Sequence, residues 1–343
     1  MSLRLAVIGC GSVSVGCHLP AIRRYPEVEL AAVVDVDADW SRTVARRFRA
    51  THHLTDYRDL VGIADAAVVA TPNTTHAGIA RFCLEHGIHV LCEKPVATTR
   101  EDARQVFDTA RAHGMRCMAA HNLRHAANLQ ALKALIERGT LVGPLTITAG
   151  LGKAYRPELY RTDFRRNARL AGGGVLLDLG VHFIDVAIWL AGSRPAVAAS
   201  TCVDTLGWGV EHDAEVVLRF PHGSTARLTF SYTRPTSTPL RVEAANGWAV
   251  ASFDRGYSDL QFFSPLAPAC RHDGAQTITL PDAGVYARQI QHFCSAILSS
   301  APFSVETGEV LDGLTVIDRI YDAWRSDGCS TPELRSLPAQ AAL

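Results

Sequence analysis

The chain has 343 residues, which is long for a single hydrophobic core and suits two domains. Its 34 basic and 34 acidic side chains cancel, which argues against nucleic acid or an anionic membrane surface as the main partner. Nine cysteines without a C-x-x-C pair do not indicate a disulfide scaffold, so we expect reduced thiols and a cytoplasmic protein.

The first 121 residues alternate short apolar runs with helical patterns. Apolar runs that predict buried strands lie at 3–9, 28–35, 64–71, 89–95 and 115–121, and helical patterns lie at 19–25, 39–50, 75–87 and 98–114. The last helix is expected to begin with a capping box from Thr98 to Glu101 and to end at Gly114. This alternation predicts a domain over residues 1–121 with a doubly wound parallel sheet covered on both faces.

After residue 121 the pattern changes. Helical patterns lie at 129–139, 175–192, 286–297 and 310–324, and strands are expected at 144–152, 215–220, 225–232 and 241–253. Residues 155–174 have the composition of a loop and are rich in Arg. We therefore predict an α+β domain over residues 122–343, with an antiparallel or mixed sheet that carries helices on one face.

Two glycines follow the first expected strand, in the stretch VIGCGSVS. In a dinucleotide-binding fold, a glycine at the position of Gly9 makes the tight turn, and one at Gly11 lets the backbone approach the pyrophosphate. The N-terminus of the next helix then faces the negative charge. Ser14 stands where the fingerprint has a third glycine, so an ordinary strand-to-helix turn is the alternative.

Asp35 ends the second expected strand, 24 residues after Gly11. A carboxylate at this place can accept hydrogen bonds from both hydroxyls of an adenosine ribose, and it repels a 2′-phosphate. No Arg or Ser follows Asp35 directly, so the sequence favours NAD over NADP. The alternative is that Asp35 caps the next helix, although Asp37 and Asp39 are better placed for that role.

Polar residues also follow two later strands, at the same expected edge of the sheet. Thr71, Asn73 and Thr74 come after one strand, and Glu93 and Lys94 end the next. Ligands of open α/β sheets bind along this edge, although Asn73 or Thr74 could also serve as a helix N-cap. Lys94 is one of three lysines among 34 basic residues, and an amine, unlike a guanidinium, can exchange a proton. This favours a chemical role for Lys94.

The apolar helix expected at 175–192 contains the ionisable residues Asp178, His182 and Asp185, spaced by four and then three. This spacing places them on one face of a helix that is apolar on its other faces. Gly180 between them suggests the close approach of another backbone or a ligand. A His in this setting can take a proton from an alcohol as a hydride leaves, with a carboxylate one turn away to orient it. The alternatives are a surface Asp–His pair and a buried His with satisfied hydrogen bonds.

Together, the stretches VIGCGSVS, HLPAI, VVDVD, ATPNTTHAGIA, CEKP and GGGVLLDLGVHFID resemble the Gfo/Idh/MocA family, named after glucose–fructose oxidoreductase, inositol dehydrogenase and a rhizopine-catabolism dehydrogenase. The resemblance covers nearly the whole chain. It implies an N-terminal Rossmann domain and a C-terminal domain with a large open, mostly antiparallel sheet that usually pairs subunits. It also implies NAD or NADP as the cofactor and sugars, cyclitols or their derivatives as substrates.

The resemblance further implies roles for individual residues. Lys94 contacts the nicotinamide side and the reacting hydroxyl, Asp178 and His182 match the remaining catalytic positions, and the bond before Pro95 is expected to be cis. The expected cofactor contacts are Gly9, Gly11, Ser12, Val13, Asp35, Thr71, Pro72, Asn73, His76, Glu93 and Lys94. The stretch AHNLRHAANL departs from the family's pattern. Candidate substrate contacts in this stretch are Asn122, Arg124 and His125, and the full set of expected contacts is Asn122, Arg124, Tyr155 and Arg165.

A cluster of arginines precedes the apolar helix; its members are Arg156, Arg161, Arg165, Arg166 and Arg169. Arginine clusters suit phosphate or carboxylate groups, which would make a sugar nucleotide a plausible substrate. The alternative is a solvated loop or a subunit contact. His121 and His125 lie four apart without an acidic third ligand, so we expect no metal site.

These observations predict an NAD(P)-dependent oxidoreductase that transfers a hydride between a nicotinamide and a ring hydroxyl or ketone of a sugar, cyclitol or derivative. His182 is the expected base, Lys94 the proton relay and polarising group, and Asp178 the tuning carboxylate. The alternatives are a ketoreductase for a keto sugar nucleotide, redox-neutral sugar chemistry with tightly bound NAD, and a catalytically silent nucleotide sensor. Some family ketoreductases carry Tyr in place of His182, so His favours a dehydrogenase.

We expect a homodimer or homotetramer that binds a polyol or sugar and has no nucleic-acid or membrane partner. The first strand begins almost at Met1, so no leader peptide is expected. No apolar run is expected to reach the length of a membrane span.

Overall fold

The computed structural model describes residues 2–156, 158, 164–253, 256–270, 274–281 and 283–327. This part of the chain forms two compact units. The first unit comprises Met1–His125, Arg156–Gly172 and Ala283–Leu311, and the second comprises Ala126–Tyr155, Gly173–Asp282 and Asp312–Leu343. The first unit therefore combines the N-terminal segment with two segments from the second half of the chain.

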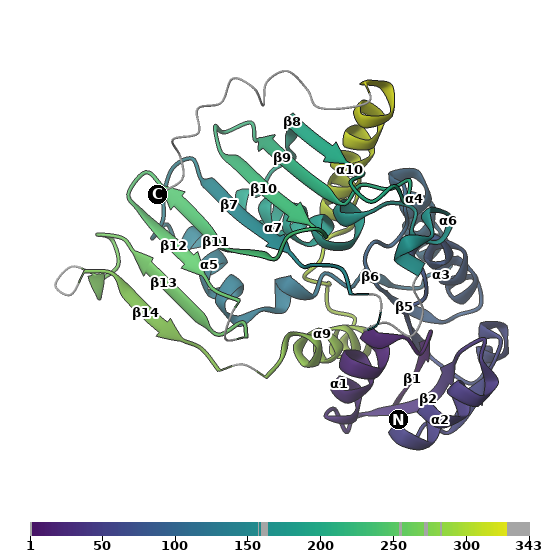
Figure 1. The fold of residues 1–343 in the computed structure, drawn as a ribbon. Helices are drawn as coiled ribbons and strands as arrows, with labels where there is room; N and C mark the ends of the chain where they lie inside the picture. Colours follow the sequence, from purple (N-terminus) through teal and green to yellow (C-terminus); the bar gives the residue numbers. More distant parts are fainter. Residues whose placement is uncertain are drawn as a thin grey trace. The chain divides into compact units, whose positions relative to one another are not determined.

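The first unit is built on a parallel sheet of six strands in the order β3-β2-β1-β4-β5-β6 (Figure 1). The strands are β1 (Leu3–Ile8), β2 (Val28–Val34), β3 (His52–Leu54), β4 (Ala66–Val69), β5 (His89–Cys92) and β6 (Cys117–Ala119). All residues of β4 and β6 are buried, as in strands covered on both faces. The edge strand β3 has two exposed histidines and no apolar run, which is why the sequence did not predict it.

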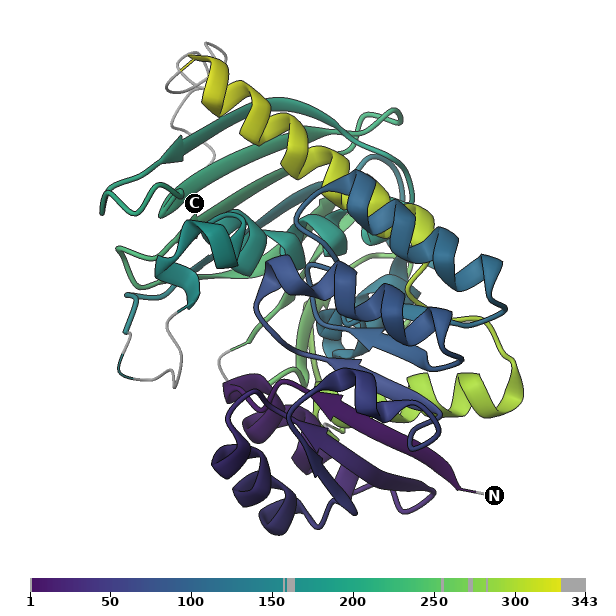
Figure 2. The ribbon, with the colours of Figure 1, turned by 90° about the vertical axis from the view of Figure 1, so that its right-hand side faces the viewer.

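The α-helices of the first unit, except α6, lie within a few residues of the predicted ranges. The helices, with η marking 3₁₀- or π-helical turns, are η1 (Ser14–His18), α1 (Leu19–Arg23), α2 (Ala38–Phe48), η2 (Tyr57–Leu60), η3 (Asn73–Thr75), α3 (His76–Glu85), α4 (Arg100–Ala112), η4 (Asn122–His125), η6 (Phe164–Arg166), α6 (Ala168–Ala171) and α9 (Val285–Ser299). The chain runs from β1 outward to β3, and then from β4 in the opposite direction to β6. Right-handed crossovers therefore place α1 and α2 on one face of the sheet and α3 and α4 on the other. The N-terminus lies at the start of β1 (Figure 2).

Helix α4 follows the segment that carries Lys94, and Thr99 fixes its start. The Thr99 hydroxyl oxygen accepts a hydrogen bond from the N–H of Asp102 at 3.1 Å, and the hydroxyl donates to the Asp102 carboxylate at 2.8 Å. The predicted capping box from Thr98 to Glu101 is therefore wrong by one residue, because Thr99 has the extended backbone of an N-cap, with φ −130° and ψ 154°.

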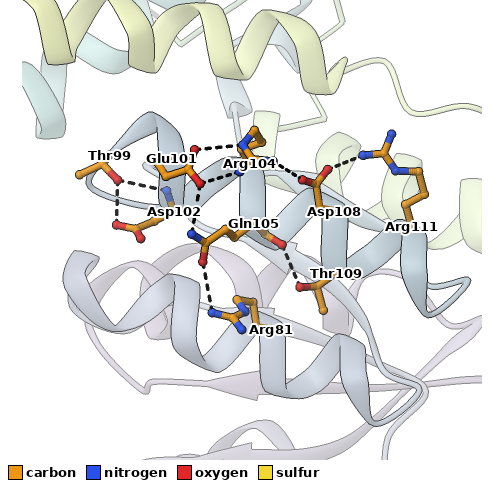
Figure 3. A network of polar contacts seen from close by, with 9 residues as sticks. All are labelled: Arg81, Thr99, Glu101, Asp102, Arg104, Gln105, Asp108, Thr109 and Arg111. Carbon is orange, nitrogen blue, oxygen red and sulfur yellow. Dashed lines mark hydrogen bonds and ion pairs between the residues drawn. The ribbon is translucent and has the colours of Figure 1, made fainter.

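Exposed polar side chains join α4 to α3 across the surface of the first unit (Figure 3). Arg104 lies between Glu101 and Asp108 and pairs with them at 2.6 and 2.7 Å. Gln105 donates a hydrogen bond to Glu101 and accepts one from Arg81 of α3. Hydrogen bonds from Arg104 and Gln105 lower the pKa of Glu101 to about 2. Because these groups are solvent-exposed, the network contributes little to the stability of the folded state.

The second unit contains an open sheet of eight strands in the order β14-β13-β12-β11-β7-β10-β9-β8 (Figure 1). The strands are β7 (Thr146–Gly152), β8 (Ala196–Val203), β9 (Asp213–Arg219), β10 (Thr225–Ser231), β11 (Thr236–Ala244), β12 (Gly247–Ala251), β13 (Asp259–Phe263) and β14 (Gln276–Thr279). Strands β7 and β10 pair in parallel, and the other neighbours pair antiparallel. This confirms the predicted large, mostly antiparallel sheet.

Helices of the second unit pack on this sheet. Helix α5 (Ala127–Glu137) lies against β12 and β13, and α7 (Val181–Ala191) lies against β10 (Figure 1). A π-helical turn, η7 (Leu176–Gly180), precedes α7. The single helix predicted over 175–192 therefore consists of two segments that are wound differently.

An apolar helical stretch, Ala168–Ala191, has the length and composition of a membrane span, with a mean hydropathy of 1.7. The prediction that no apolar run reaches this length is therefore wrong. In the structure 78% of its apolar window is buried. Ile184 and Ile188 face Gly313 of α10 (Thr307–Asp327), the long yellow helix in Figure 2. The stretch comprises α6, η7 and α7, with bends at 172–174, and its burial is typical of helices in a protein core.

Replacing Thr99 tests the start of α4. Thr99→Ala leaves the N–H of Asp102 without its acceptor, so we expect the free energy of unfolding to fall by about 1 kcal/mol. Thr99→Ser retains the hydroxyl and should stay close to wild type. Urea denaturation followed by circular dichroism measures both variants. A loss in the Ser variant as large as in the Ala variant would contradict the assignment of the N-cap.

Candidate active site

Gly9 ends β1 and turns the chain toward the first helix. Its φ is 90°, which favours glycine, and a Cβ there would lie 2.5 Å from the carbonyl oxygen of Ala70. The fold itself therefore requires this glycine. At Gly11, by contrast, a Cβ would meet no protein atom within 4 Å, so packing does not explain the glycine. The bare backbone at Gly11 instead fits the approach of a pyrophosphate group.

Ser14 stands at the position where the fingerprint has its third glycine, and its side chain has a structural role there. It is fully buried, and its hydroxyl donates a hydrogen bond to the carbonyl oxygen of Gly9 at 2.5 Å. The third position therefore closes the turn with a hydrogen bond. Ser12 and Val13 begin the helical segment that continues through η1 and α1. The first turn of a helix presents N–H groups that have no intrahelical acceptor, which suits an anion.

Asp35 is half-buried at the end of β2 and binds the glycine turn. Its carboxylate accepts hydrogen bonds from the N–H groups of Cys10 at 2.9 Å and Asp37 at 3.0 Å. Asp37 caps α2, since its own carboxylate accepts from the N–H of Trp40 at 3.0 Å. The alternative that Asp35 is the helix cap is therefore wrong. The arrangement holds a carboxylate beside the turn that is predicted to receive the pyrophosphate.

His76 is buried and fastens two backbone segments of the first unit. Its Nδ1 lies 2.7 Å from the carbonyl oxygen of Pro95, and its Nε2 lies 2.7 Å from that of Thr71. Burial lowers the pKa of His76, although the two carbonyl oxygens act in the opposite direction. His76 thus joins the end of β4 to the turn that follows Lys94. The Lys94–Pro95 bond is cis, as the resemblance implies.

Glu93 places a carboxylate next to Lys94 at the end of β5. It is buried, lies 2.7 Å from Nε2 of His18, and accepts a hydrogen bond from the N–H of Lys94 at 3.2 Å. Burial acts to raise the pKa of Glu93, but the hydrogen bond and charge of His18 and the charge of Lys94 outweigh burial, so the pKa is lowered. An ionised carboxylate therefore balances the ammonium group at this half-buried position.

Asn73 and Thr74 bind backbone groups of α6. The Asn73 amide donates to the carbonyl oxygen of Ala171 at 2.9 Å, and the Thr74 hydroxyl donates to that of Leu170 at 3.1 Å. Neither side chain caps the helix that follows, so the N-cap alternative is wrong. The loop predicted over 155–174 also did not include α6, because a helix of four residues shows no helical pattern in the sequence.

In the second unit, Asp178 and His182 are half-buried on η7 and α7, whereas Asp185 is buried. The Asp178 carboxylate accepts a hydrogen bond at 2.7 Å from the hydroxyl of Tyr232, which follows β10. This arrangement does not fit a solvated surface pair. Instead, a phenol from the sheet orients the carboxylate.

Close packing explains why residue 180 is a glycine. A Cβ there would lie 3.1 Å from a methyl carbon of Leu176 and 3.2 Å from the ring of Phe230 on β10. The close approach suggested by the sequence is therefore made by side chains, and the expectation of a backbone or ligand at Gly180 is wrong. The ring of Phe230 also lies 5.9 Å from that of Phe183 on α7. These contacts fix the helix segment on the sheet.

Sequence reasoning missed Glu211, which holds the start of η7. Glu211 is fully buried ahead of β9 and accepts hydrogen bonds from the N–H groups of Gly174 at 3.1 Å and Leu176 at 2.9 Å. The hydroxyl of Tyr321 donates a further bond at 2.8 Å. Burial raises the pKa of Glu211, although these donors act in the opposite direction. The carboxylate thus takes the place of an N-cap for the segment that carries Asp178.

The same contacts explain two of the three glycines ahead of η7. A Cβ at Gly174 would lie 1.9 Å from the carbonyl oxygen of Glu211, and a Cβ at Gly173 would lie 2.2 Å from the hydroxyl oxygen of Tyr321. The sequence signal for Glu211 is weak, because three other ionisable residues share its stretch VEHDAEVV. His212 in the same stretch is equally buried, so only the hydrogen bonds from Gly174 and Leu176 distinguish Glu211.

The predicted substrate contacts have different surroundings. Asn122 and Arg124 are buried in the first unit, and the guanidinium of Arg124 pairs with Glu309. The charge of Arg124 is therefore neutralised within that unit. Arg165 and Tyr155 are half-buried. Tyr155 follows β7, next to the strand that leads to Tyr232.

Within the arginine cluster, three side chains are exposed and Arg165 is half-buried, while Arg161 lies outside the described residues. The exposed side chains are Arg156, Arg166 and Arg169. Their exposure is compatible with both anion binding and a subunit contact. Across the ranges that the structure describes, no group of three or more His, Cys, Asp or Glu residues could hold a metal ion.

Two family models match consecutive parts of the chain. Residues 3–121 match a model described as an oxidoreductase family with an NAD-binding Rossmann fold. Residues 129–250 match a model described as the GFO/IDH/MocA C-terminal domain. The first range contains the whole parallel sheet, and the second contains β7 to β11 and most of β12. Together they cover more than half of the chain.

The chain is similar to sugar-converting enzymes over most of its length. It is 27% identical over 326 residues to D-xylose 1-dehydrogenase (NADP(+)) 2 of Haloferax volcanii, covering 94% of this chain and 97% of the relative. It is 26% identical over 301 residues to dTDP-3,4-didehydro-2,6-dideoxy-alpha-D-glucose 3-reductase of Actinomadura kijaniata, covering 87% and 88%. Its fold resembles that of a levoglucosan dehydrogenase solved with NADH and levoglucosan, with a TM-score of 0.85 and 21% identity over 97% of this chain and 100% of that one.

Glu211→Gln tests the buried carboxylate at the start of η7. A carboxyl group with a raised pKa binds more protons in the folded than in the unfolded state, so its contribution to stability falls as pH rises from 4.5 through the folded-state value. We therefore expect the melting temperature of wild type, measured relative to Glu211→Gln, to fall as the pH is raised from mildly acidic to neutral. Differential scanning calorimetry at several pH values measures this difference. A difference that does not change with pH would contradict the assignment.

Proposed function

The chain belongs to the Gfo/Idh/MocA family of oxidoreductases, and we propose that it is an NAD-dependent dehydrogenase for a ring hydroxyl of a sugar, cyclitol or derivative. The observation that carries the proposal is that each unit supplies part of the required chemistry. The first unit holds Lys94 beside the Glu93 carboxylate, and the second holds Asp178 and His182 on one helical segment. The relative named for D-xylose, which matches 94% of the chain, supports the substrate class.

The side chains have distinct roles in the proposed reaction. His182 takes the proton of the reacting hydroxyl. Lys94 donates a hydrogen bond to the same oxygen and stabilises the negative charge that develops on it. Asp178, oriented by the Tyr232 hydroxyl, tunes the basicity of His182. NAD supplies the hydride acceptor when it is bound.

The first unit fits the cofactor. The turn at Gly9 and Gly11 receives the pyrophosphate, the N–H groups of Ser12 and Val13 face it, and Asp35 receives the ribose hydroxyls. The remaining proposed contacts lie after β4 and β5; they are Thr71, Pro72, Asn73, His76, Glu93 and Lys94. Both ring nitrogens of His76 lie within hydrogen-bonding distance of backbone carbonyl oxygens, those of Pro95 and Thr71. We therefore assign His76 the role of positioning the segments that follow β4 and β5.

A second candidate function is the reduction of a keto sugar nucleotide. It is supported by the match to the Actinomadura kijaniata reductase and by the exposed Arg156, Arg166 and Arg169, which suit a diphosphate. His182 favours the dehydrogenase. Redox-neutral sugar chemistry with tightly bound NAD and nucleotide sensing without catalysis are the other candidates.

We further propose that residues 1–121 bind the dinucleotide and that residues 122–343 bind the substrate and pair subunits into a homodimer or homotetramer. The breadth of the open eight-stranded sheet supports its use as a subunit interface. Of the predicted substrate contacts, Tyr155 has the most support, because its ring lies 5.6 Å from that of Tyr232. We propose a cytoplasmic location, supported by the eight cysteines among the described residues, none of which forms a disulfide.

A substrate panel and a Lys94 variant test the function together. With NAD and a panel of inositols, free sugars and sugar nucleotides, we expect the absorbance of reduced nicotinamide to rise with a free sugar or cyclitol. Lys94→Ala should lower turnover at least about a hundredfold, because the reacting oxygen loses its charged donor, while the affinity for NAD changes little. Lys153→Ala, an exposed lysine, is the matched control.

The outcomes separate the candidates. A ketoreductase would consume reduced cofactor only with a keto sugar nucleotide. A redox-neutral enzyme would retain NAD through purification and convert its substrate without net NADH. A silent sensor would bind NAD and turn over nothing. Full activity of Lys94→Ala would overturn the role given to the amine.

Asp35 determines the expected choice between NAD and NADP. Its carboxylate faces the ribose position and repels a 2′-phosphate, so Asp35→Ser should lower the ratio of kcat/KM for NAD to that for NADP by about a hundredfold. Asp39→Ser, an exposed residue of α2, should leave the ratio unchanged. Equal use of both cofactors by the wild type would contradict this assignment.

A further inference from the structure

Three neighbouring strands of the second unit bring a row of aromatic rings to one end of the sheet. The N–H of Tyr155, after β7, donates to the carbonyl oxygen of Tyr232 at 2.9 Å, and the N–H of Tyr232 donates to that of His212 at 2.7 Å. The ring of Tyr232 lies 5.6 Å from that of Tyr155 and 6.4 Å from that of His212. Backbone pairing across the sheet therefore fixes this row.

Trp208 joins the row from the loop that precedes β9. Its ring meets those of Tyr155 and His212 edge-on, with centroids 5.2 and 4.5 Å apart. The loop is held by Asp204, whose carboxylate accepts hydrogen bonds from the N–H groups of Trp208 at 3.1 Å and of the glycines on either side at 2.8 Å. Burial opposes ionisation of Asp204, but these N–H groups outweigh it and lower its pKa. A charged anchor thus sets the position of the indole.

The row is partly accessible and lies next to the proposed chemistry. Tyr232 is buried and donates its hydroxyl proton to the Asp178 carboxylate at 2.7 Å. Tyr155 and Trp208 are half-buried, so part of each ring surface is open to solvent. Trp and Tyr are rarely covered completely, so the distinguishing feature is that two partly open rings lie together in the row that contacts Asp178 through Tyr232. A half-open aromatic pair beside a carboxylate is typical of a ligand site with an apolar wall and a few polar groups.

The exposed Lys153 and Arg156 flank Tyr155 in the sequence, but carboxylates surround the rings themselves and favour a neutral ligand there. Asp178 and Asp204 carry carboxylates at the two sides of the row, and Asp213 follows His212 in the sequence. Arg234 pairs with Asp213 at 3.7 Å, so the positive charge of Arg234 is partly neutralised. A phosphate placed against these rings would meet several negative groups, whereas the C–H face of a sugar ring would not.

We propose that Tyr155 and Trp208 form a stacking platform for the apolar C–H face of a pyranose ring, with the reacting carbon held toward Asp178. A pyranose chair with equatorial hydroxyls, as in β-D-glucose or D-xylose, carries axial C–H groups on its faces and hydroxyls around its edge. An aromatic wall binds the face while the carboxylate and His182 bind the edge. This deepens the proposed function and rests on it only for the identity of the reacting carbon. An acyclic polyol lacks such a face and should gain little from the platform.

Saturation-transfer NMR tests the platform without requiring turnover. Wild-type protein with saturating NAD is mixed in turn with methyl β-D-glucopyranoside, D-xylose and, as the acyclic control, sorbitol. We expect saturation of ring C–H protons of the pyranose probes and little saturation of sorbitol. Trp208→Ala should weaken pyranose binding about tenfold, and Tyr155→Ala should weaken it to a similar extent. Trp248→Ala is the matched control, because Trp248 lies on β12 and packs against Arg241.

The outcomes separate the platform from the reaction. Circular dichroism and NAD titration establish that each variant is folded, and Tyr155→Ala replaces Trp208→Ala as the test if the latter fails to fold. The platform is overturned if no pyranose probe is saturated, if sorbitol is saturated equally, or if the folded variants bind like wild type. Pyranose binding that is lost in these variants, without turnover of any panel member, would support the platform and overturn the proposed reaction. For a pyranose substrate of the wild type, the variants should raise KM about tenfold with kcat nearly unchanged.

Discussion

Carboxylates that accept backbone N–H groups hold the segments on which the proposed chemistry depends. The pairs are Asp35 with the glycine turn, Glu93 with Lys94, Glu211 with the start of η7, and Asp204 with the Trp208 loop. In each case a side chain from another part of the chain, from the preceding residue or from the same loop binds N–H groups that a turn or helix start leaves without an acceptor. If these N–H groups were unsatisfied, the segments would have no fixed position.

Holding a segment with a buried carboxylate has an energetic cost, because the carboxylate loses hydration when it is buried. Glu93 and Glu211 differ in how that cost is offset. Glu93 accepts a hydrogen bond from His18 and lies next to the Lys94 amine, and its pKa is lowered despite burial. Glu211 has only neutral donors, and its pKa is raised. Charge is thus retained most firmly next to the amine that the proposed reaction uses, and is least favoured where the carboxylate only holds a helix.

The groups assigned to proton transfer are rigidly held, whereas those proposed to recognise the substrate lie in variable segments. This combination suits a family with many substrates. The groups assigned to proton transfer lie on a strand end and a helical segment that the core fixes, which favours catalysis by positioning. Tyr155 and Trp208 lie in connecting segments, where sequence change is tolerated better than in the core. The residues proposed to recognise the sugar ring can therefore change without disturbing Asp178, although Tyr232 connects the two sets.

The sequence by itself determined the parallel and the mostly antiparallel sheet, the glycine turn at Gly9, and the helical segment that carries Asp178 and His182. Hydrophobic period, turn residues and helix stops act over a few residues, so they can be read locally; even so, the cap of α4 was misplaced by one position. Only the tertiary structure decided the role of Glu211, the Tyr232–Asp178 bond and the aromatic row. These contacts join residues that are 37, 54 and 110 positions apart, for Gly174–Glu211, Asp178–Tyr232 and Glu211–Tyr321. Which distant side chains meet is set by sheet register and helix packing, and no local pattern records it.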